Sequence, residues 1–197
     1  MIEQILQGLE AKGYSFLPQF LNEEQILRIN KFFDEYRGEF RPAKIGMNGS
    51  KQRIDSIRGD YTYWLNPINS KGPFVEVFEF LNKLRDQINE RFYLGLKEYE
   101  CHLAYYPPDS FYHRHLDRFN KDSSRTISFV FYLNKSWDIS NGGEIVMYDK
   151  KGNILDSFSP MPGAFICFLS DEFPHEVRSS NLERRSLTGW MHNKIIY

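Results

Sequence analysis

The sequence predicts a mainly β domain, either a closed antiparallel barrel or a double-sheet jelly roll, backed by N-terminal helices. Apolar residues recur at helical spacing in the first part of the chain, and after Gly95 short apolar runs separated by turn residues replace them. Aromatic residues make up 16% of the chain, which also favours strands. The length of 197 residues suits one domain. We therefore predict a single domain over residues 1–197, with helical support over about 1–95 and the jelly-roll core over about 96–193.

Three helices and a short strand are predicted in the supporting part. Apolar residues at positions 2, 5, 6 and 9 indicate the first helix, and Tyr14–Leu17 is predicted as a strand. Asn22 predicts the N-cap of a second helix, because Gln25 stands three residues later in the capping-box position. Pro73 is predicted at the first position of the third and longest helix. The polar, glycine-punctuated segment Phe40–Ser56 is predicted to be a loop or a loose hairpin.

Eight strands are predicted in the core. Each is a short run rich in aromatic and β-branched residues, and glycine, proline or asparagine stands in several of the turns between them. The predicted strands are Glu98–Tyr106, Phe111–Asp117, Thr126–Leu133, Glu144–Tyr148, Ile154–Phe158, Ala164–Leu169, His175–Arg178 and Arg184–Asn193.

The charge balance and the cysteines narrow the class of protein. With 25 basic and 26 acidic residues the net charge is −1, which gives no support to a nucleic-acid or membrane partner. No signal peptide or transmembrane run is recognisable in the sequence. We therefore expect Cys101 and Cys167 to be reduced core residues of a cytoplasmic protein.

His115 and Asp117 are the first candidate metal ligands. They stand two residues apart on a predicted strand, so both side chains are expected on one face. His175 follows far along the chain, and an antiparallel barrel can bring it close. Two imidazoles and one carboxylate on one side of a metal form the facial triad of non-haem Fe(II) oxygenases, which leaves coordination positions open. By spacing alone the pattern is common, and a purely structural role stays open.

The other histidines are weaker candidates for metal ligands. His113 shares the predicted strand face of His115, and we set it aside as a decoy. His102 and His192 have no ligand-like neighbours in the sequence and are expected to be structural or exposed.

The last predicted strand has one face suited to lining a pocket, formed by Arg184, Ser186, Thr188 and Trp190. The opposite face, from Arg185 to Met191, is expected to pack against a helix. A guanidinium on the pocket face can clamp a carboxylate through two hydrogen bonds, as a metal-chelating 2-oxo acid requires at its far end. A surface salt bridge of Arg184 with Glu183 or Glu176 is the alternative.

A set of motifs in fixed order resembles a known family. The motifs are Ile57-Arg58-Gly59-Asp60 with Trp64, Tyr112-His113-Arg114-His115-Leu116-Asp117, Tyr132-Leu133-Asn134-Lys135-Ser136-Trp137, Gly142-Gly143-Glu144, Ser170-Asp171, Pro174-His175-Glu176-Val177 and Arg184 to Trp190. Together they resemble the 2-oxoglutarate- and Fe(II)-dependent dioxygenases. Within these, the similarity is greatest to the prolyl 4-hydroxylase class, specifically the HIF prolyl hydroxylases and their bacterial relatives. The resemblance extends over roughly residues 56–193.

The resemblance implies a double-stranded β-helix, or jelly-roll, core and a set of site residues. Iron would be bound by His115, Asp117 and His175, with 2-oxoglutarate and O2 as cosubstrates and ascorbate as a candidate reductant. The distal carboxylate of 2-oxoglutarate would pair with Arg184, in preference to Arg185. The remaining residues of the cosubstrate pocket would be Tyr132, Tyr106, Thr188 and Trp190.

The resemblance also implies residues on the substrate side. Tyr112 would lie near the iron, and Arg58 and Trp64 are further candidates for substrate contact. Asp60 and Arg125 match a pair whose ion bridge would hold a mobile loop. The segment Phe40–Ser56 falls where relatives carry a substrate-covering segment.

The family implies a hydroxylase, most naturally of a prolyl residue in a protein or peptide. One alternative is hydroxylation of a small molecule such as a free amino acid, for which Arg58 or Arg118 could act as an extra carboxylate clamp. Another is a non-catalytic metal-binding module that works as a sensor or interaction domain, which would form no succinate.

Overall fold

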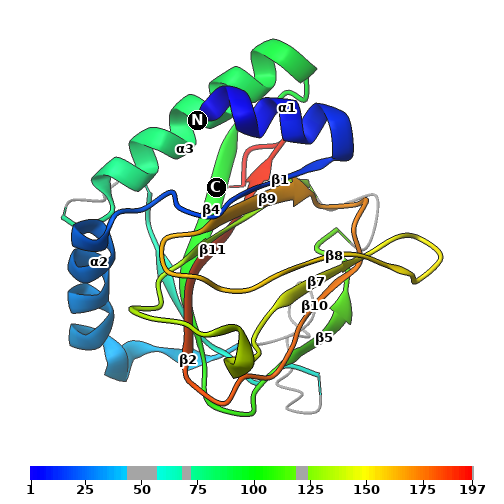
Figure 1. The fold of residues 1–197 in the computed structure, drawn as a ribbon. Coiled ribbons are helices and arrows are strands. Elements are labelled where there is room, and N and C mark those ends of the chain that lie inside the picture. Colours follow the sequence, from blue (N-terminus) through cyan, green and yellow to red (C-terminus); the bar gives the residue numbers. More distant parts are fainter. Residues whose placement is uncertain (44–56, 68–71, 119–123, 197) are drawn as a thin grey trace.

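The computed structural model describes residues 1–43, 57–67, 72–118 and 124–196. Two antiparallel sheets form a jelly-roll core (Figure 1). The larger sheet has seven strands in the order β1-β9-β6-β11-β4-β3-β2, and the smaller has four in the order β5-β10-β7-β8. The predicted mainly β fold with N-terminal helices is confirmed.

Three helices support the larger sheet, namely α1 (Ile2–Lys12), α2 (Glu23–Glu35) and α3 (Val75–Phe92). Their apolar faces share one buried cluster with the outward-facing residues of β4, β6, β9 and β11, so they cover the outer face of that sheet (Figure 1). The capping box is confirmed: Asn22 Oδ1 accepts from the Gln25 backbone N–H at 2.9 Å, and Gln25 Oε1 from that of Asn22 at 3.0 Å. The placement of Pro73 is wrong, because α3 begins at Val75 after a turn.

All eight predicted core strands and the predicted strand at Tyr14–Leu17 are present, within two residues at each end. Two strands were not predicted, β2 and β3, which extend the larger sheet beyond β4. Short 3-10 helices stand at Arg37–Glu39 and Ile139–Asn141. The strands are β1 (Tyr14–Leu17), β2 (Arg41–Pro42), β3 (Tyr61–Leu65), β4 (Glu98–Tyr106), β5 (Tyr112–His115), β6 (Arg125–Tyr132), β7 (Ile145–Tyr148), β8 (Ile154–Phe158), β9 (Phe165–Leu169), β10 (His175–Val177) and β11 (Arg184–His192).

The larger sheet separates two environments by the alternation of its side chains. On β11, Leu187 and Met191 belong to the helix-side core, as the sequence predicted. On β6, Val130 and Tyr132 pack with residues of β7 and β9 in a second cluster between the sheets. The inner face of β11 therefore turns Arg184, Ser186, Thr188 and Trp190 toward the space between the sheets.

Strand β5 is not the regular strand that the sequence predicted. His175 of β10 pairs with His115, but Val177 pairs with Tyr112, so β5 carries one extra residue at this point. This β-bulge puts Tyr112 and His115 on the same side, where their rings stack at 3.6 Å. His113 is exposed and does not share the face of His115, contrary to the expected alternation.

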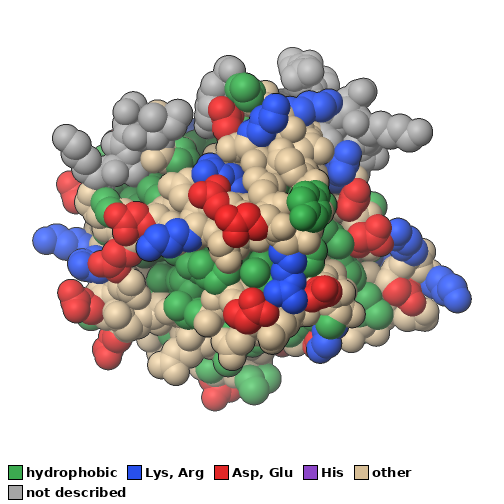
Figure 2. All heavy atoms as spheres, turned by 90° about the horizontal axis from the view of Figure 1, so that it is seen from above, with side chains coloured by type: hydrophobic (Ala, Val, Ile, Leu, Met, Phe, Trp, Pro, Cys, Tyr) green, Lys and Arg blue, Asp and Glu red, His purple; other side chains and the backbone are tan. Residues whose placement is uncertain are grey.

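Acidic and basic side chains are interspersed over the face that carries α1 and α3 (Figure 2). This distribution agrees with the nearly balanced charge of the sequence. None of the helices in the described ranges has the length and apolar character needed to cross a membrane.

Candidate metal centre and cosubstrate pocket

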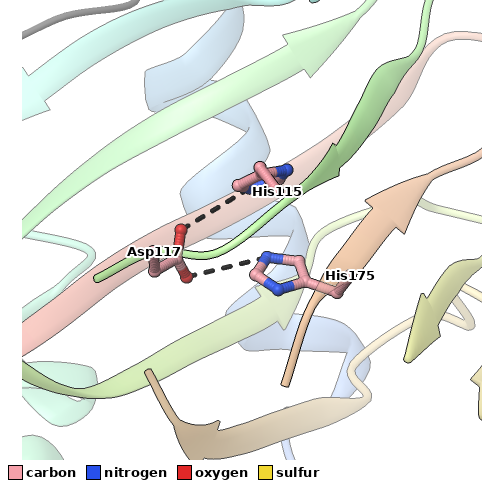
Figure 3. Close-up of side chains that lie close together, drawn as sticks. All are labelled: His115, Asp117 and His175. Carbon is pink, nitrogen blue, oxygen red and sulfur yellow. Dashed lines mark ion pairs between the residues drawn. The ribbon is translucent and has the colours of Figure 1, made fainter. Parts of the chain in front are cut away.

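His115, Asp117 and His175 converge on one point between the sheets (Figure 3). One potential ligand atom from each lies within 4.8 Å of the others. His115 Nε2 is 3.5 Å from Asp117 Oδ1, and His175 Nε2 is 3.6 Å from Asp117 Oδ2. The side chains are 9%, 10% and 6% exposed in the order His115, Asp117 and His175, so water has little access to the donor atoms.

The pairing of β5 with β10 brings the two histidines together, because His115 and His175 are direct cross-strand partners. Asp117 follows two residues after β5 and is held from the larger sheet. Ser128 of β6 donates a hydrogen bond to Asp117 Oδ2 at 2.6 Å, and its hydroxyl lies 2.9 Å from that of Ser170. The site is thus built from both sheets and depends on their packing.

Backbone carbonyls set the tautomer of both histidines. Nδ1 of His115 is 2.8 Å from the carbonyl oxygen of His113, and Nδ1 of His175 is 3.0 Å from that of Phe173. A carbonyl oxygen can only accept, so each Nδ1 carries a proton, and each Nε2, which faces Asp117, is the ring nitrogen left to bind a metal. This arrangement presents two ring nitrogens and one carboxylate to an ion.

The electrostatics of the cluster favour the protonation states that bind a metal, namely a neutral imidazole at His175 and an ionised carboxylate at Asp117. Burial and the neighbouring His115 lower the pKa of His175 to about 4, so its imidazole is neutral at pH 7. Burial opposes ionisation of Asp117, but the adjacent His175 and His115 and the Ser128 hydroxyl hold the pKa of this carboxyl well below its usual range. His175 and Asp117 therefore need to release no proton when they bind a metal near neutral pH.

Arg184 lies buried at the start of β11 and is 2% exposed. Its Nε donates to the carbonyl of Gly143 at 3.0 Å, and its guanidinium carbon lies 5.1 and 5.0 Å from the ring centres of Tyr106 and Tyr132. Within the described parts of the chain Arg184 has no carboxylate partner. Glu183, the expected competitor, pairs instead with Arg37 and Arg185.

A buried guanidinium without an acid is unfavourable unless a ligand supplies the negative charge. The hydroxyl of Tyr132 strengthens this argument, because it is buried and its proton has no acceptor among the described residues. Ser128, which contacts Asp117, and Tyr132 stand on one face of β6 four residues apart, about 13 Å at the rise of a β-strand. The donor set therefore fits a carboxylate-bearing ligand that lies along this face toward the metal ligands.

Comparison with known proteins agrees with this geometry. The model of the 2OG-Fe(II) oxygenase superfamily matches residues 101–192. A solved prolyl-4-hydroxylase of Pseudomonas putida is 34% identical, with a TM-score of 0.87 over 99% of this chain and 100% of its own. The chain belongs to the 2OG-Fe(II) oxygenase superfamily. Within it, this oxygenase is an enzyme of the prolyl 4-hydroxylase-like type.

Further relatives of the oxygenase come from animals. Prolyl hydroxylase EGLN3 of Mus musculus is 27% identical in an alignment 205 residues long. The alignment covers 96% of this chain and 82% of the relative. A prolyl hydroxylase of Trichoplax adhaerens, solved with a peptide fragment of a hypoxia-inducible factor, shares the fold at 22% identity and a TM-score of 0.83. That alignment covers 98% of this chain and 89% of the solved one.

Thr188 and Trp190 lie on the same inner face of the larger sheet, whereas Tyr112 belongs to β5 of the smaller sheet. Thr188 contacts Ser186 through a hydroxyl pair at 3.2 Å, and Trp190 is buried beneath the guanidinium of Arg125 at 3.6 Å. Tyr112 stacks on His115, as described above. On β3, Trp64 is 51% exposed. Its ring lies 4.8 Å from His102 and 6.4 Å from Trp190.

The expected ion pair of Asp60 with Arg125 is wrong. Asp60 is buried and holds Arg58 through two hydrogen bonds, Nε to Oδ1 at 2.7 Å and Nη2 to Oδ2 at 2.6 Å. Arg125 instead binds Glu100 at 2.7 Å. The segment expected to cover substrate, Phe40–Ser56, lies outside the described residues from position 44 onward.

Sequence reasoning assigned no role to three residues that support the oxygenase site, although Ser170 and Gly143 stand in motifs that carry the resemblance. Ser128 and Ser170 orient the carboxylate of Asp117, and for Ser128 the only available signal was a serine in the apolar run of β6. Gly143 accepts from Arg184 and has a φ of 77°. A Cβ there would lie 3.0 Å from Trp137 and 3.4 Å from Arg184, so this turn favours glycine.

Proposed function

We propose that this oxygenase hydroxylates a prolyl residue of a protein or peptide, with Fe(II) bound by His115, Asp117 and His175. The cluster of these three side chains carries the proposal, because its donor set of two imidazoles and one carboxylate suits Fe(II). The prolyl target follows the similarity to the Pseudomonas putida prolyl-4-hydroxylase and to EGLN3. When bound, iron with 2-oxoglutarate and O2 supplies the oxidising power for C–H hydroxylation, and 2-oxoglutarate leaves as succinate and CO2.

Arg184 is proposed to bind the distal carboxylate of 2-oxoglutarate through its guanidinium, with the Tyr132 hydroxyl donating a further hydrogen bond. Tyr106 lines the same end of the pocket, and its ring lies beside the Arg184 guanidinium. Thr188 and Trp190 line the face that leads from there toward the iron ligands. These groups fix one end of the cosubstrate, so that its 2-oxo acid end reaches the metal.

The residues on the substrate side favour a neutral group over a free amino acid. An additional clamp for a small acid would need an unpaired cation near the iron. Arg58, which lies over the Tyr112 ring at 4.3 Å, is neutralised by Asp60. Arg118, the other candidate clamp, is 3.2 Å from Asp171. A neutral peptide group needs no such cation in order to bind, and the exposed side chain of Trp64 gives a peptide an apolar surface to contact.

The proposal can be tested by incubating wild-type enzyme and a His175→Ala variant with host lysate, Fe(II) and 2-oxoglutarate. Mass spectrometry should find proline residues that gain one oxygen with the wild type only. Modification of free amino acids without any protein-bound hydroxyproline would favour the small-molecule reaction. Absence of succinate formation with both kinds of substrate would favour the non-catalytic module.

A further inference from the structure

His102 stands on the inner face of the larger sheet, beside the residues assigned to the cosubstrate. In the register of the strands it is the direct partner of Thr188 on β11 and of Trp64 on β3. Ala104 and Tyr106, at the same alternation on β4, pack with Val177 of the smaller sheet. His102 therefore faces the space between the sheets, on the side of the site toward β3.

Two buried polar atoms at this place have no partner among the described residues, namely His102 Nδ1 and Trp190 Nε1. The side chains are 3% and 8% exposed, and their ring centres are 5.5 Å apart. Buried polar atoms are normally hydrogen-bonded, and two neighbouring exceptions beside a binding site indicate a ligand or water that binds there. Trp64 contacts both rings and is the exposed member of the group.

The charges around these two atoms are already neutralised within the protein. Asp60 holds Arg58, and Glu100 holds Arg125. Burial lowers the pKa of His102 to about 4, so the imidazole is uncharged at pH 7 and offers one donor and one acceptor nitrogen. The indole N–H of Trp190 is a donor only. The two unpartnered atoms, Trp190 Nε1 and His102 Nδ1, can therefore serve as one donor and one acceptor, without charge.

We propose that His102 and Trp190 form a subsite for a backbone peptide group of the primary substrate. The indole N–H of Trp190 donates to the peptide carbonyl, His102 Nδ1 accepts from the peptide N–H, and Trp64 packs over the bound segment. This inference rests on the proposed function, since it names how a peptide substrate of that reaction is held. It makes His102 a specificity-determining residue that recognises main chain rather than side chain.

The test uses a library of hexapeptides with acetylated and amidated ends and a fixed central proline, with Fe(II) and 2-oxoglutarate. Wild-type, His102→Met and His102→Gln enzymes are compared by the ratio of hydroxylated peptide to succinate. His102→Met should lower this ratio about fivefold, the equivalent of one neutral hydrogen bond. His102→Gln retains an acceptor and a donor and should stay within about twofold of the wild type.

A second measurement separates recognition from a merely structural role. For one hydroxylated peptide, each amide is replaced in turn by an ester, and binding is measured without O2. One ester should weaken binding to the wild type about fivefold but have no effect with His102→Met, because the lost contact is the same in both. Equal losses in both proteins, or equal hydroxylation ratios in wild type and His102→Met, would overturn the subsite. Failure of the wild type to hydroxylate any library peptide would overturn the proposed peptide reaction and the subsite with it.

Discussion

Replacing Arg184 by lysine should weaken 2-oxoglutarate binding far more than the same replacement at Arg185. The two arginines are neighbours in sequence but lie on opposite faces of β11. Arg184 is 2% exposed beside Tyr132 and Tyr106, without a carboxylate partner among the described residues. Arg185 contacts Asn30 and Asp34 of α2 on the helix side of the sheet.

The magnitude follows from the hydrogen bonds that lysine cannot make. Lysine keeps the charge of Arg184 but loses the planar fork and the 3.0 Å bond of Nε to Gly143. One charge-assisted hydrogen bond contributes about 1.5–3 kcal/mol, so the dissociation constant of 2-oxoglutarate should rise about 10- to 150-fold. Arg185→Lys should change it less than about threefold, because that side chain forms only partly exposed ion pairs.

The assay is titration calorimetry of 2-oxoglutarate into the Fe(II) enzyme without O2, followed by the dependence of succinate formation on 2-oxoglutarate concentration. Wild-type enzyme and the two lysine variants are measured together. A larger loss for Arg185→Lys would show that the assignment is displaced by one residue. Equal losses would refute the claim that one face of β11 binds the cosubstrate.

Three further changes probe the surroundings of the site. Ser128→Ala removes the 2.6 Å hydrogen bond to Asp117 and should weaken Fe(II) binding about 10-fold in competition with a chelator; unchanged affinity would mean that this bond does not orient the ligand. Glu183→Gln removes the common partner of Arg37 and Arg185 and should lower the free energy of unfolding by about 1 kcal/mol in urea titrations, a result that an unaltered midpoint would contradict. Burial raises the pKa of Glu100, but His192 and Arg125 outweigh this and lower it to about 2 from its ordinary value of 4.5. Its ionised form therefore stabilises the fold above pH 4.5, by up to about 3 kcal/mol, and this contribution disappears toward pH 2. The difference in unfolding free energy between wild type and Glu100→Gln should shrink over this interval, and a difference independent of pH would refute the assignment.

Most of the fold could be predicted because it depends on local patterns. The alternation in β4 and β11 and the turn residues between strands mark the core, and the capping box at Asn22 marks the start of α2. Strand β3 was missed, although Tyr61–Leu65 is aromatic and β-branched, because its sequence does not alternate regularly between apolar and polar residues. It becomes a strand by pairing with β4.

The candidate site could be predicted at the level of residue identity but not of side-chain partners. Arg184 was distinguished from Arg185 by the alternation along β11. No glycine or proline in the sequence of β5 indicates the bulge. The exposed position of His113 could therefore not be predicted. The partner of Asp60 could not be predicted either. Both Arg58 and Arg125 could have formed the ion pair, and only the packing of the chain places Arg58 next to Asp60.

The iron content of purified enzyme tests the central claim most directly. After reconstitution without O2 and removal of loosely bound metal, the wild type and His113→Ala should each retain about one Fe(II) per chain, because the His113 side chain is exposed. His175→Ala should retain almost none and form no succinate from 2-oxoglutarate. Full iron occupancy with continued succinate formation in His175→Ala would contradict the assignment of His115, Asp117 and His175 as the metal centre.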